Sequence, residues 1–140
     1  DRAQLNRLVE RHDWIWITGN HDPDIPAGLG GQVLNEYREG ALVFRHEAMP
    51  GAPGGEISGH FHPKATVTAR GRRLSGKCFV EDGRRLILPS FGAYTGGLSV
   101  RDTAFSGLFA GQTRAHVIGR SAVHCFPVSR VLPERRALSA

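Results

Sequence analysis

The stretch "WIWITGNHDP", residues 14–23, joins a run of bulky residues to a polar cluster. The apolar run over residues 14–18 ends at a glycine, which is typical of a strand covered on both faces in a parallel or mixed sheet. Asn20, His21 and Asp22 follow directly. Loops at the carboxyl ends of strands in α/β sheets commonly carry binding and catalytic residues. This stretch is therefore the first candidate for a functional site.

A second unusual stretch is "GHFHP", residues 59–63. In an extended segment, residues two apart point to the same side, so we expect His60 and His62 to share one face and Phe61 to enter the core. Two imidazoles side by side are a common half of a transition-metal site. His46 follows another β-rich run and is the only histidine between His21 and His60. Because strand ends converge on one rim of a sheet, we expect these polar side chains to meet.

The remaining pattern predicts one helix followed by many short strands. Apolar residues at helical spacing predict a short amphipathic helix over residues 3–11, and two prolines favour a loop over residues 19–31. From residue 40 onward, β-rich runs separated by Gly, Pro or Asp-Gly predict consecutive antiparallel strands. The sequence further predicts an Asp-Gly type I′ hairpin over residues 80–85, an ordered loop with one helical turn over 92–111, two strands within 115–132 and a loose tail over 133–140.

Composition limits the class of protein. The chain has 140 residues and a net charge of +5, with sixteen arginines against two lysines. The planar guanidinium suits phosphate oxygens, although a high arginine content also follows from genome composition. No apolar window is long enough for a membrane span and the start lacks the apolar centre of a signal peptide, so we expect a cytoplasmic protein with no membrane association. Cys78 and Cys125 are far apart, and both are expected in the core.

The ordered blocks Gly19-Asn20-His21-Asp22, His46 and Gly59-His60-Phe61-His62 resemble those of the calcineurin-like metallophosphoesterase superfamily. Residues 44–63 and 87–100 more narrowly resemble the bacterial ligase-associated DNA damage response endonuclease family. The resemblance covers most of residues 14–132. It implies an α/β fold, the α/β/β/α sandwich of the metallophosphoesterases. The chain would lack the N-terminal part of that sandwich, so that residues 1–132 form the C-terminal two thirds of one domain.

The resemblance also implies a site and a reaction. Asn20, His46 and His60 would bind one divalent metal ion and His62 a second, with manganese as the expected metal and iron or zinc as alternatives. His21 would be the catalytic residue beside the leaving-group oxygen, while Asp22 either orients His21 or simply forms the turn. The implied function is hydrolysis of phosphodiester bonds by a DNA endonuclease of the DNA damage response, with DNA as substrate and association with a DNA ligase and a helicase.

Other interpretations stay open at this point. The superfamily's Asp-x-His and Gly-Asp blocks are missing, and only Asp1 and Asp13 precede the first strand, so we expect the 140 residues alone to be inactive. A small-molecule phosphodiesterase or phosphatase would share the same metal core, and a non-catalytic interaction module would keep only the fold. A cupin is disfavoured because residues 64–70 contain no glutamate. The basic run over residues 70–77 either follows a phosphate backbone or forms a solvated hairpin edge.

Overall fold

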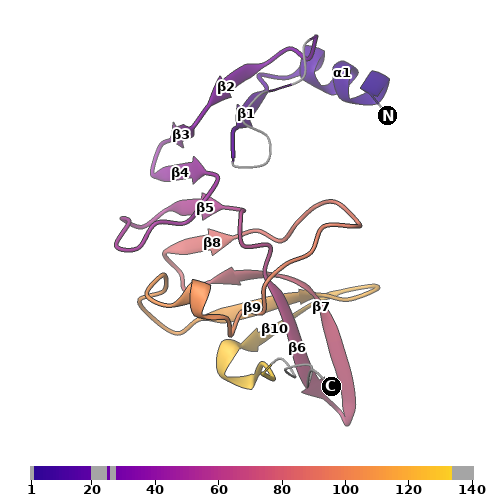
Figure 1. The fold of residues 1–140 in the computed structure, drawn as a ribbon, viewed down its shortest axis with the longest axis vertical. Helices are drawn as coiled ribbons and strands as arrows, with labels where there is room; N and C mark the ends of the chain where they lie inside the picture. Colours follow the sequence, from indigo (N-terminus) through magenta and orange to yellow (C-terminus); the bar gives the residue numbers. More distant parts are fainter. Residues whose placement is uncertain (1, 20–24, 26–27, 134–140) are drawn as a thin grey trace, which may run out of the picture.

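The structure is a computed structural model that describes residues 2–19, 25 and 28–133. It has mixed α/β architecture, with a two-stranded sheet near the N-terminus and a larger eight-stranded sheet (Figure 1). The elements are α1 (Arg2–Arg11), β1 (Ile15–Ile17), β2 (Gln32–Leu34), β3 (Glu36–Glu39), β4 (Leu42–Arg45), β5 (Glu56–Ser58), β6 (Lys64–Ala69), β7 (Arg72–Glu81), β8 (Arg85–Ile87), η1 (Thr103–Phe105), β9 (Arg114–Ile118), β10 (Val123–Pro127) and η2 (Val128–Arg130).

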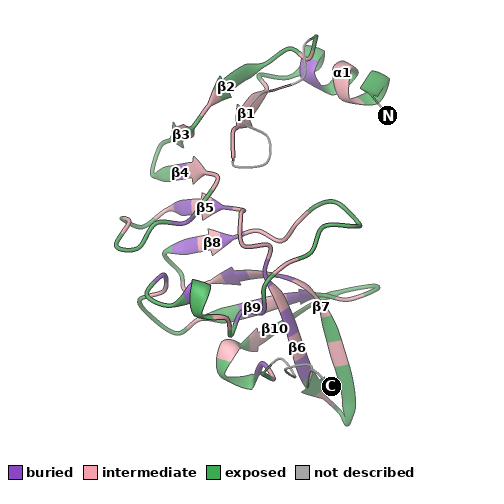
Figure 2. Cartoon of the chain, viewed as in Figure 1, coloured by how far each residue is buried: buried purple, intermediate pink, exposed green. Residues whose placement is uncertain are grey.

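The N-terminal elements are only lightly packed. The predicted helix is confirmed as α1, and Val9 is its buried residue. Strand β1 pairs in parallel with β2, as the sequence predicts for this run. The expectation that β1 is covered on both faces is wrong, because all three of its residues are only half-buried (Figure 2). Its pairing within the described residues is limited to β2.

The larger sheet combines parallel and antiparallel pairs. Its order is β10-β9-β7-β8-β5-β4-β3, and β6 pairs with β7 outside that path. The expectation of consecutive antiparallel strands is wrong at the centre, where β4, β5 and β8 run parallel. Residues 46–55 return the chain to the amino end of β5, and strands β6 and β7 lie between β5 and β8 in the chain, so each parallel pair is joined by a crossover and not by a direct hairpin. As a result, the carboxyl ends of these three strands lie at one edge of the sheet.

The hairpin between β7 and β8 forms, but with a different turn. Val80 pairs with Ile87, so the two central residues of the turn are Gly83 and Arg84. The sequence predicted Asp82 and Gly83, one residue earlier. Gly83 has a φ of 79°, whereas a type I′ turn requires positive φ at both central residues. The Oδ1 atom of Asp82 accepts hydrogen bonds at 3.0 Å from the backbone N–H groups of Arg84 and Arg85. This side-chain cap fixes the turn and explains the shift.

The basic run over residues 70–77 includes the turn of the β6–β7 hairpin. Its two central residues, Arg70 and Gly71, have φ values of 50° and 72°, the combination that a type I′ turn requires. Arg70, Arg72 and Arg73 are exposed. The hairpin interpretation is therefore confirmed, and a role for the arginines in following a phosphate backbone stays a prediction.

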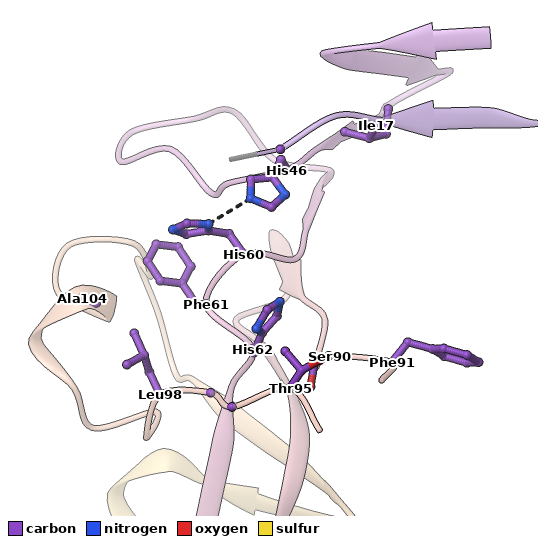
Figure 3. Close-up of a pocket in the computed structure, with 13 residues that line it drawn as sticks. Ile17, His46, His60, Phe61, His62, Ser90, Phe91, Thr95, Leu98 and Ala104 are labelled. Carbon is purple, nitrogen blue, oxygen red and sulfur yellow. Dashed lines mark hydrogen bonds between the residues drawn. The ribbon is translucent and has the colours of Figure 1, made fainter. Parts of the chain in front are cut away.

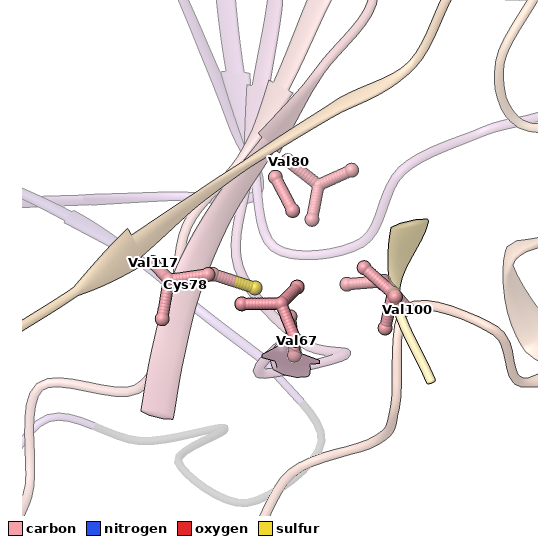
Figure 4. Close-up of a cluster of buried hydrophobic side chains, with 8 residues drawn as sticks. Val67, Cys78, Val80, Val100 and Val117 are labelled. Carbon is pink, nitrogen blue, oxygen red and sulfur yellow. The ribbon is translucent and has the colours of Figure 1, made fainter. Parts of the chain in front are cut away.

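The main core lies between the antiparallel strands. Val67 on β6, Cys78 and Val80 on β7, and Val117 on β9 are fully buried (Figure 4). Buried residues alternate along each strand, as expected where one face of a sheet is covered. The predicted helical turn within residues 92–111 is present as η1, and the two predicted strands within 115–132 are β9 and β10.

The two cysteines lie in different environments. Cys78 is in the core, as predicted, and burial raises the pKa of its thiol to about 12. Cys125 is exposed, so the prediction that it is a core residue is wrong. It lies on β10, which is at the edge of the sheet and whose residues are mostly exposed. Both cysteines are free.

The described residues contain no helix that is long and apolar enough to cross a membrane. The predicted tail lies almost wholly outside the part of the chain that the structure describes, since residues 134–140 are not described.

Candidate functional site

A cavity of about 860 Å³ lies where β4, β5 and β8 end. His46 follows β4, the segment with His60 and His62 follows β5, and Ser90 lies beyond β8 (Figure 3). All four side chains line the cavity. The parallel pairing in the middle of the sheet therefore brings together three residues that the sequence predicts as metal ligands.

His46 and His60 contact each other directly in the site. The Nε2 atom of His46 lies 3.0 Å from the Nδ1 atom of His60, and the two rings meet edge to face. This contact is a hydrogen bond in the absence of a metal ion, and two nitrogens that bind one ion at about 2.1 Å are about 3.0 Å apart at right angles and about 3.4 Å apart in a tetrahedral site. The separation of these two atoms therefore fits two ligands of one ion.

The end of β1 approaches the same pair. A Cβ atom built on Gly19 would lie 2.3 Å from the Nδ1 atom of His46, so a larger residue at position 19 would collide with the imidazole ring. Glycine is therefore required where this backbone passes His46. The predicted ligand Asn20, the predicted catalytic residue His21 and its neighbour Asp22 come next in the chain, but they lie outside the described residues.

The sequence pattern predicted an extended backbone around His60 and His62. This prediction is wrong. Strand β5 ends at Ser58, and His60 and His62 have φ values of 44° and 48°. Positive φ is uncommon for residues other than glycine and is often found at functional sites. Phe61 does pack inward as predicted, with its ring centre 5.2 Å from that of Phe105. His60 and His62 therefore lie after the end of the strand, both in the left-handed backbone conformation, and both side chains line the cavity.

One acidic residue near the pair was missed in the sequence. The Oε1 atom of Glu47 lies 3.8 Å from the Nε2 atom of His60, on the opposite side of the ring from the nitrogen that contacts His46. A carboxylate beside the second nitrogen of a metal-binding histidine commonly orients its ring. The position of Glu47 directly after His46 was the available signal.

A buried charge cluster lies behind the segment that carries His46. Glu56 is 1% exposed, and its carboxylate lies 3.3 Å from Nε of Arg85 and 3.6 Å from Nη1 of Arg45. Its Oε1 atom also accepts a hydrogen bond of 3.1 Å from the backbone N–H of Met49. Arg85 donates to the carbonyl oxygen of Met49 at 2.9 Å. Glu56 and Arg85 therefore fix the chain three residues beyond His46.

The described residues supply only part of a metal-binding set. No group of three or more His, Cys, Asp or Glu side chains among them is arranged to hold a metal ion. His46 and His60 provide two adjacent nitrogens, and His62 lines the same cavity without completing a set of three. Imidazole nitrogen suits iron and zinc, whereas manganese more often takes oxygen ligands, so the predicted manganese depends on ligands other than this donor pair.

Comparison with solved structures shows a similarity to a nuclease. No family model and no curated protein matches the sequence. The crystal structure of the Pseudomonas putida nuclease MPE matches with a TM-score of 0.64 and 30% sequence identity. The match covers 89% of this chain and 61% of that nuclease, so the chain spans less than two thirds of its length. The chain has a mixed α/β fold similar to that of this nuclease.

Proposed function

We propose that this chain contributes the histidine-rich side of the active site of a metal-dependent phosphoesterase that hydrolyses phosphodiester bonds in DNA. The observation that carries the proposal is the 3.0 Å separation between the ring nitrogens of His46 and His60, beside His62 in one cavity. The similarity to a nuclease and the net charge of +5 favour nucleic acid as the substrate.

Each residue has a defined part in this proposal. His46 and His60, with Asn20, bind one divalent ion and His62 binds the second. When bound, such ions lower the pKa of a coordinated water and polarise the phosphoryl oxygens. Asn20 offers a neutral oxygen, which leaves the site cationic enough to hold a phosphodiester. His21 donates a proton to the departing alkoxide oxygen.

Manganese is the metal that we propose, with iron or zinc as alternatives. The endonuclease belongs, in this proposal, to the DNA damage response and associates with a DNA ligase and a helicase. These partners rest on the family resemblance alone, and copurification of the full-length protein with both enzymes is the direct test.

The ligand assignment is tested by replacing His60 in the full-length protein. His60→Ala should reduce bound manganese and abolish manganese-dependent cleavage of plasmid DNA. His116→Ala is the matched control, because His116 lies on β9 and contacts Glu81 instead of lining the cavity. Metal content is measured after gel filtration. Equal metal content and cleavage in the two variants would contradict the proposal.

The role of His21 has a separate test. His21→Ala should lower the rate of hydrolysis while the metal content stays at the level of the parent protein, since a leaving-group residue is not a ligand. Hydrolysis that survives within a few fold would show that His21 does not serve the leaving group.

A small-molecule phosphodiesterase is the second candidate. The cavity volume of about 860 Å³ is within the range that encloses small ligands. The two functions are separated by comparing plasmid cleavage with hydrolysis of cyclic nucleotides. Activity on cyclic nucleotides alone would favour the second candidate, and metal binding with neither activity would favour a non-catalytic interaction module.

A further inference from the structure

Two aromatic side chains of the segment 90–97, which borders the cavity, are fully exposed. Phe91 has a relative exposure of 106% and Tyr94 of 103%, whereas the next most exposed large apolar residue within the described part of the chain, Val123, has 56%. Both lie in the segment 90–97, and Phe91 itself lines the cavity that contains His46 and His60. Burying an aromatic ring is strongly favourable, so two rings left wholly in water beside a cavity suggest a partner for their faces.

The segment that carries these rings is fixed at both ends. The Nζ atom of Lys77 on β7 donates to the carbonyl oxygens of Ser90, at 3.0 Å, and Gly92. Both carbonyls that flank Phe91 therefore face Lys77, while the side chain of Phe91 points away from His62 (Figure 3).

At the other end of the segment, Leu98 joins the start of β6. The backbone N–H of Leu98 donates to the carbonyl oxygen of Phe61 at 3.2 Å, and that of Lys64 donates to the carbonyl oxygen of Leu98 at 2.8 Å. A Cβ atom on Gly97 would lie 2.0 Å from the carbonyl oxygen of His62. The segment therefore packs directly on the backbone of a predicted metal ligand, and the exposed rings have fixed attachment points beside the histidines.

We propose that Phe91 and Tyr94 form a nucleobase-binding site, the aromatic rim, which stacks on unpaired bases next to the phosphodiester at His46 and His60. The inference rests on the proposed function and extends it from the phosphate to the bases. Exposed aromatic rings bind nucleic acid strands in a largely sequence-independent manner, because every base offers a flat π-face. A phosphodiester in the cavity brings its neighbouring bases to the cavity edge, where Phe91 lies.

Binding of short single strands to the full-length protein tests the rim. A fluorescently labelled oligonucleotide is compared with a strand of equal length made of stable tetrahydrofuran abasic residues, which keeps the phosphates and lacks the bases. Phe91→Ala should weaken binding of the base-bearing strand by about 5-fold to 150-fold, the range expected for loss of one stacked base. Binding of the abasic strand should be unchanged. Tyr94→Ala should show the same selectivity.

Matched variants separate the effect of losing the aromatic π-face from the effect of losing exposed apolar surface. Phe91→Trp should retain binding, and Phe91→Leu should behave like Phe91→Ala, because leucine is apolar but has no π-face. Val123→Ala removes an exposed apolar side chain on β10 and should change neither affinity. All four substitutions affect fully or largely exposed side chains, so we expect the variants to fold.

Failure of the rim is distinguishable from failure of the proposed function. If the parent protein cleaves the abasic strand but Phe91→Ala weakens both strands equally, or neither, the phosphoesterase function stands and the rim is wrong. If the parent protein binds neither strand, the nucleic-acid function fails and the rim fails with it. Selective loss on the base-bearing strand, with cleavage of the abasic strand retained, supports both.

Discussion

The antiparallel and parallel halves of the larger sheet differ in what their residues do. In the antiparallel half, Val67, Cys78 and Val117 are fully buried and alternate regularly with outward-facing residues. In the parallel half, the strand ends carry left-handed histidines and a buried glutamate. Regular apolar packing fills the first half, whereas the second half has irregular backbone at the cavity, after the carboxyl end of β5, and buried charge at the amino end of that strand. The difference indicates that the main apolar core and the candidate site lie in different halves of one sheet.

The largest predicted effect is on the buried charge cluster. Glu56→Ala leaves Arg85 buried without its carboxylate partner, so the free energy of unfolding should fall by about 3–5 kcal/mol. The measurement is chemical denaturation of the parent protein and the variant. Glu10→Ala, at an exposed position on α1, is the control and should change stability by less than about 0.5 kcal/mol. Equal stabilities of the two variants would show that the cluster contributes nothing.

A core substitution should affect stability alone. Val67→Ala removes two methyl groups from a fully buried site, so we expect a loss of about 2–3 kcal/mol. Metal content should not change, because Val67 lies in the cluster of β6, β7 and β9 and not in the cavity. Denaturation and metal analysis on the same sample check both statements. A variant that folds but loses its metal would break the separation of the two halves.

Backbone strain at the cavity predicts that glycine is more stable than alanine at one of the histidine positions, although alanine is normally the more stabilising of the two residues. His62 has a φ of 48°, so His62→Gly should be more stable than His62→Ala by about 1 kcal/mol. Both variants lack the imidazole and should bind less metal than the parent protein. Arg70, with a φ of 50° in a surface turn, is the control site, where the same pair of substitutions should give the same difference in stability without loss of metal. Equal stabilities of His62→Gly and His62→Ala would exclude strain there.

The smallest effect concerns pH and Asp82. Although partial burial raises the pKa of Asp82, the backbone N–H groups of Ala110, Arg84 and Arg85 outweigh it and lower the pKa below its usual value of 3.8. The ionised carboxylate therefore stabilises the fold above that value, and the contribution is lost as the pH falls through the lowered pKa. As the pH falls from above 3.8 through the lowered pKa, the difference in free energy of unfolding between the parent protein and Asp82→Ala should become smaller. A difference independent of pH would contradict the assignment.

Much of the fold follows from local pattern. Short β-rich runs separated by Gly, Pro or Asp-Gly predicted β6, β7 and β9, and helical spacing predicted α1. The sequence did not predict β3, because its residues Glu36–Glu39 are polar and none is buried. Parallel pairing of β4, β5 and β8 was also missed, since it depends on how long connections return across the sheet and not on any local signal.

The site was predicted in outline but not in detail. His46, His60 and His62 converge as expected, because each follows a strand of the parallel group. The left-handed backbone at His60 and His62 depends on packing around Phe61, which the sequence does not express. The contacts of Glu56 form between segments that are far apart in the chain, so they do not follow from local sequence. The exposure of Phe91 likewise depends on how the folded segments are arranged.

The central claim is that His46 and His60 bind the same metal ion. Its most direct test is a double-mutant cycle in the full-length protein, with manganese affinity measured for His46→Ala, His60→Ala and the double variant. If both nitrogens bind one ion, the losses should be strongly non-additive, and the double variant should bind little more weakly than either single variant. Independent, additive losses, or unchanged affinity in either single variant, would contradict a shared ion.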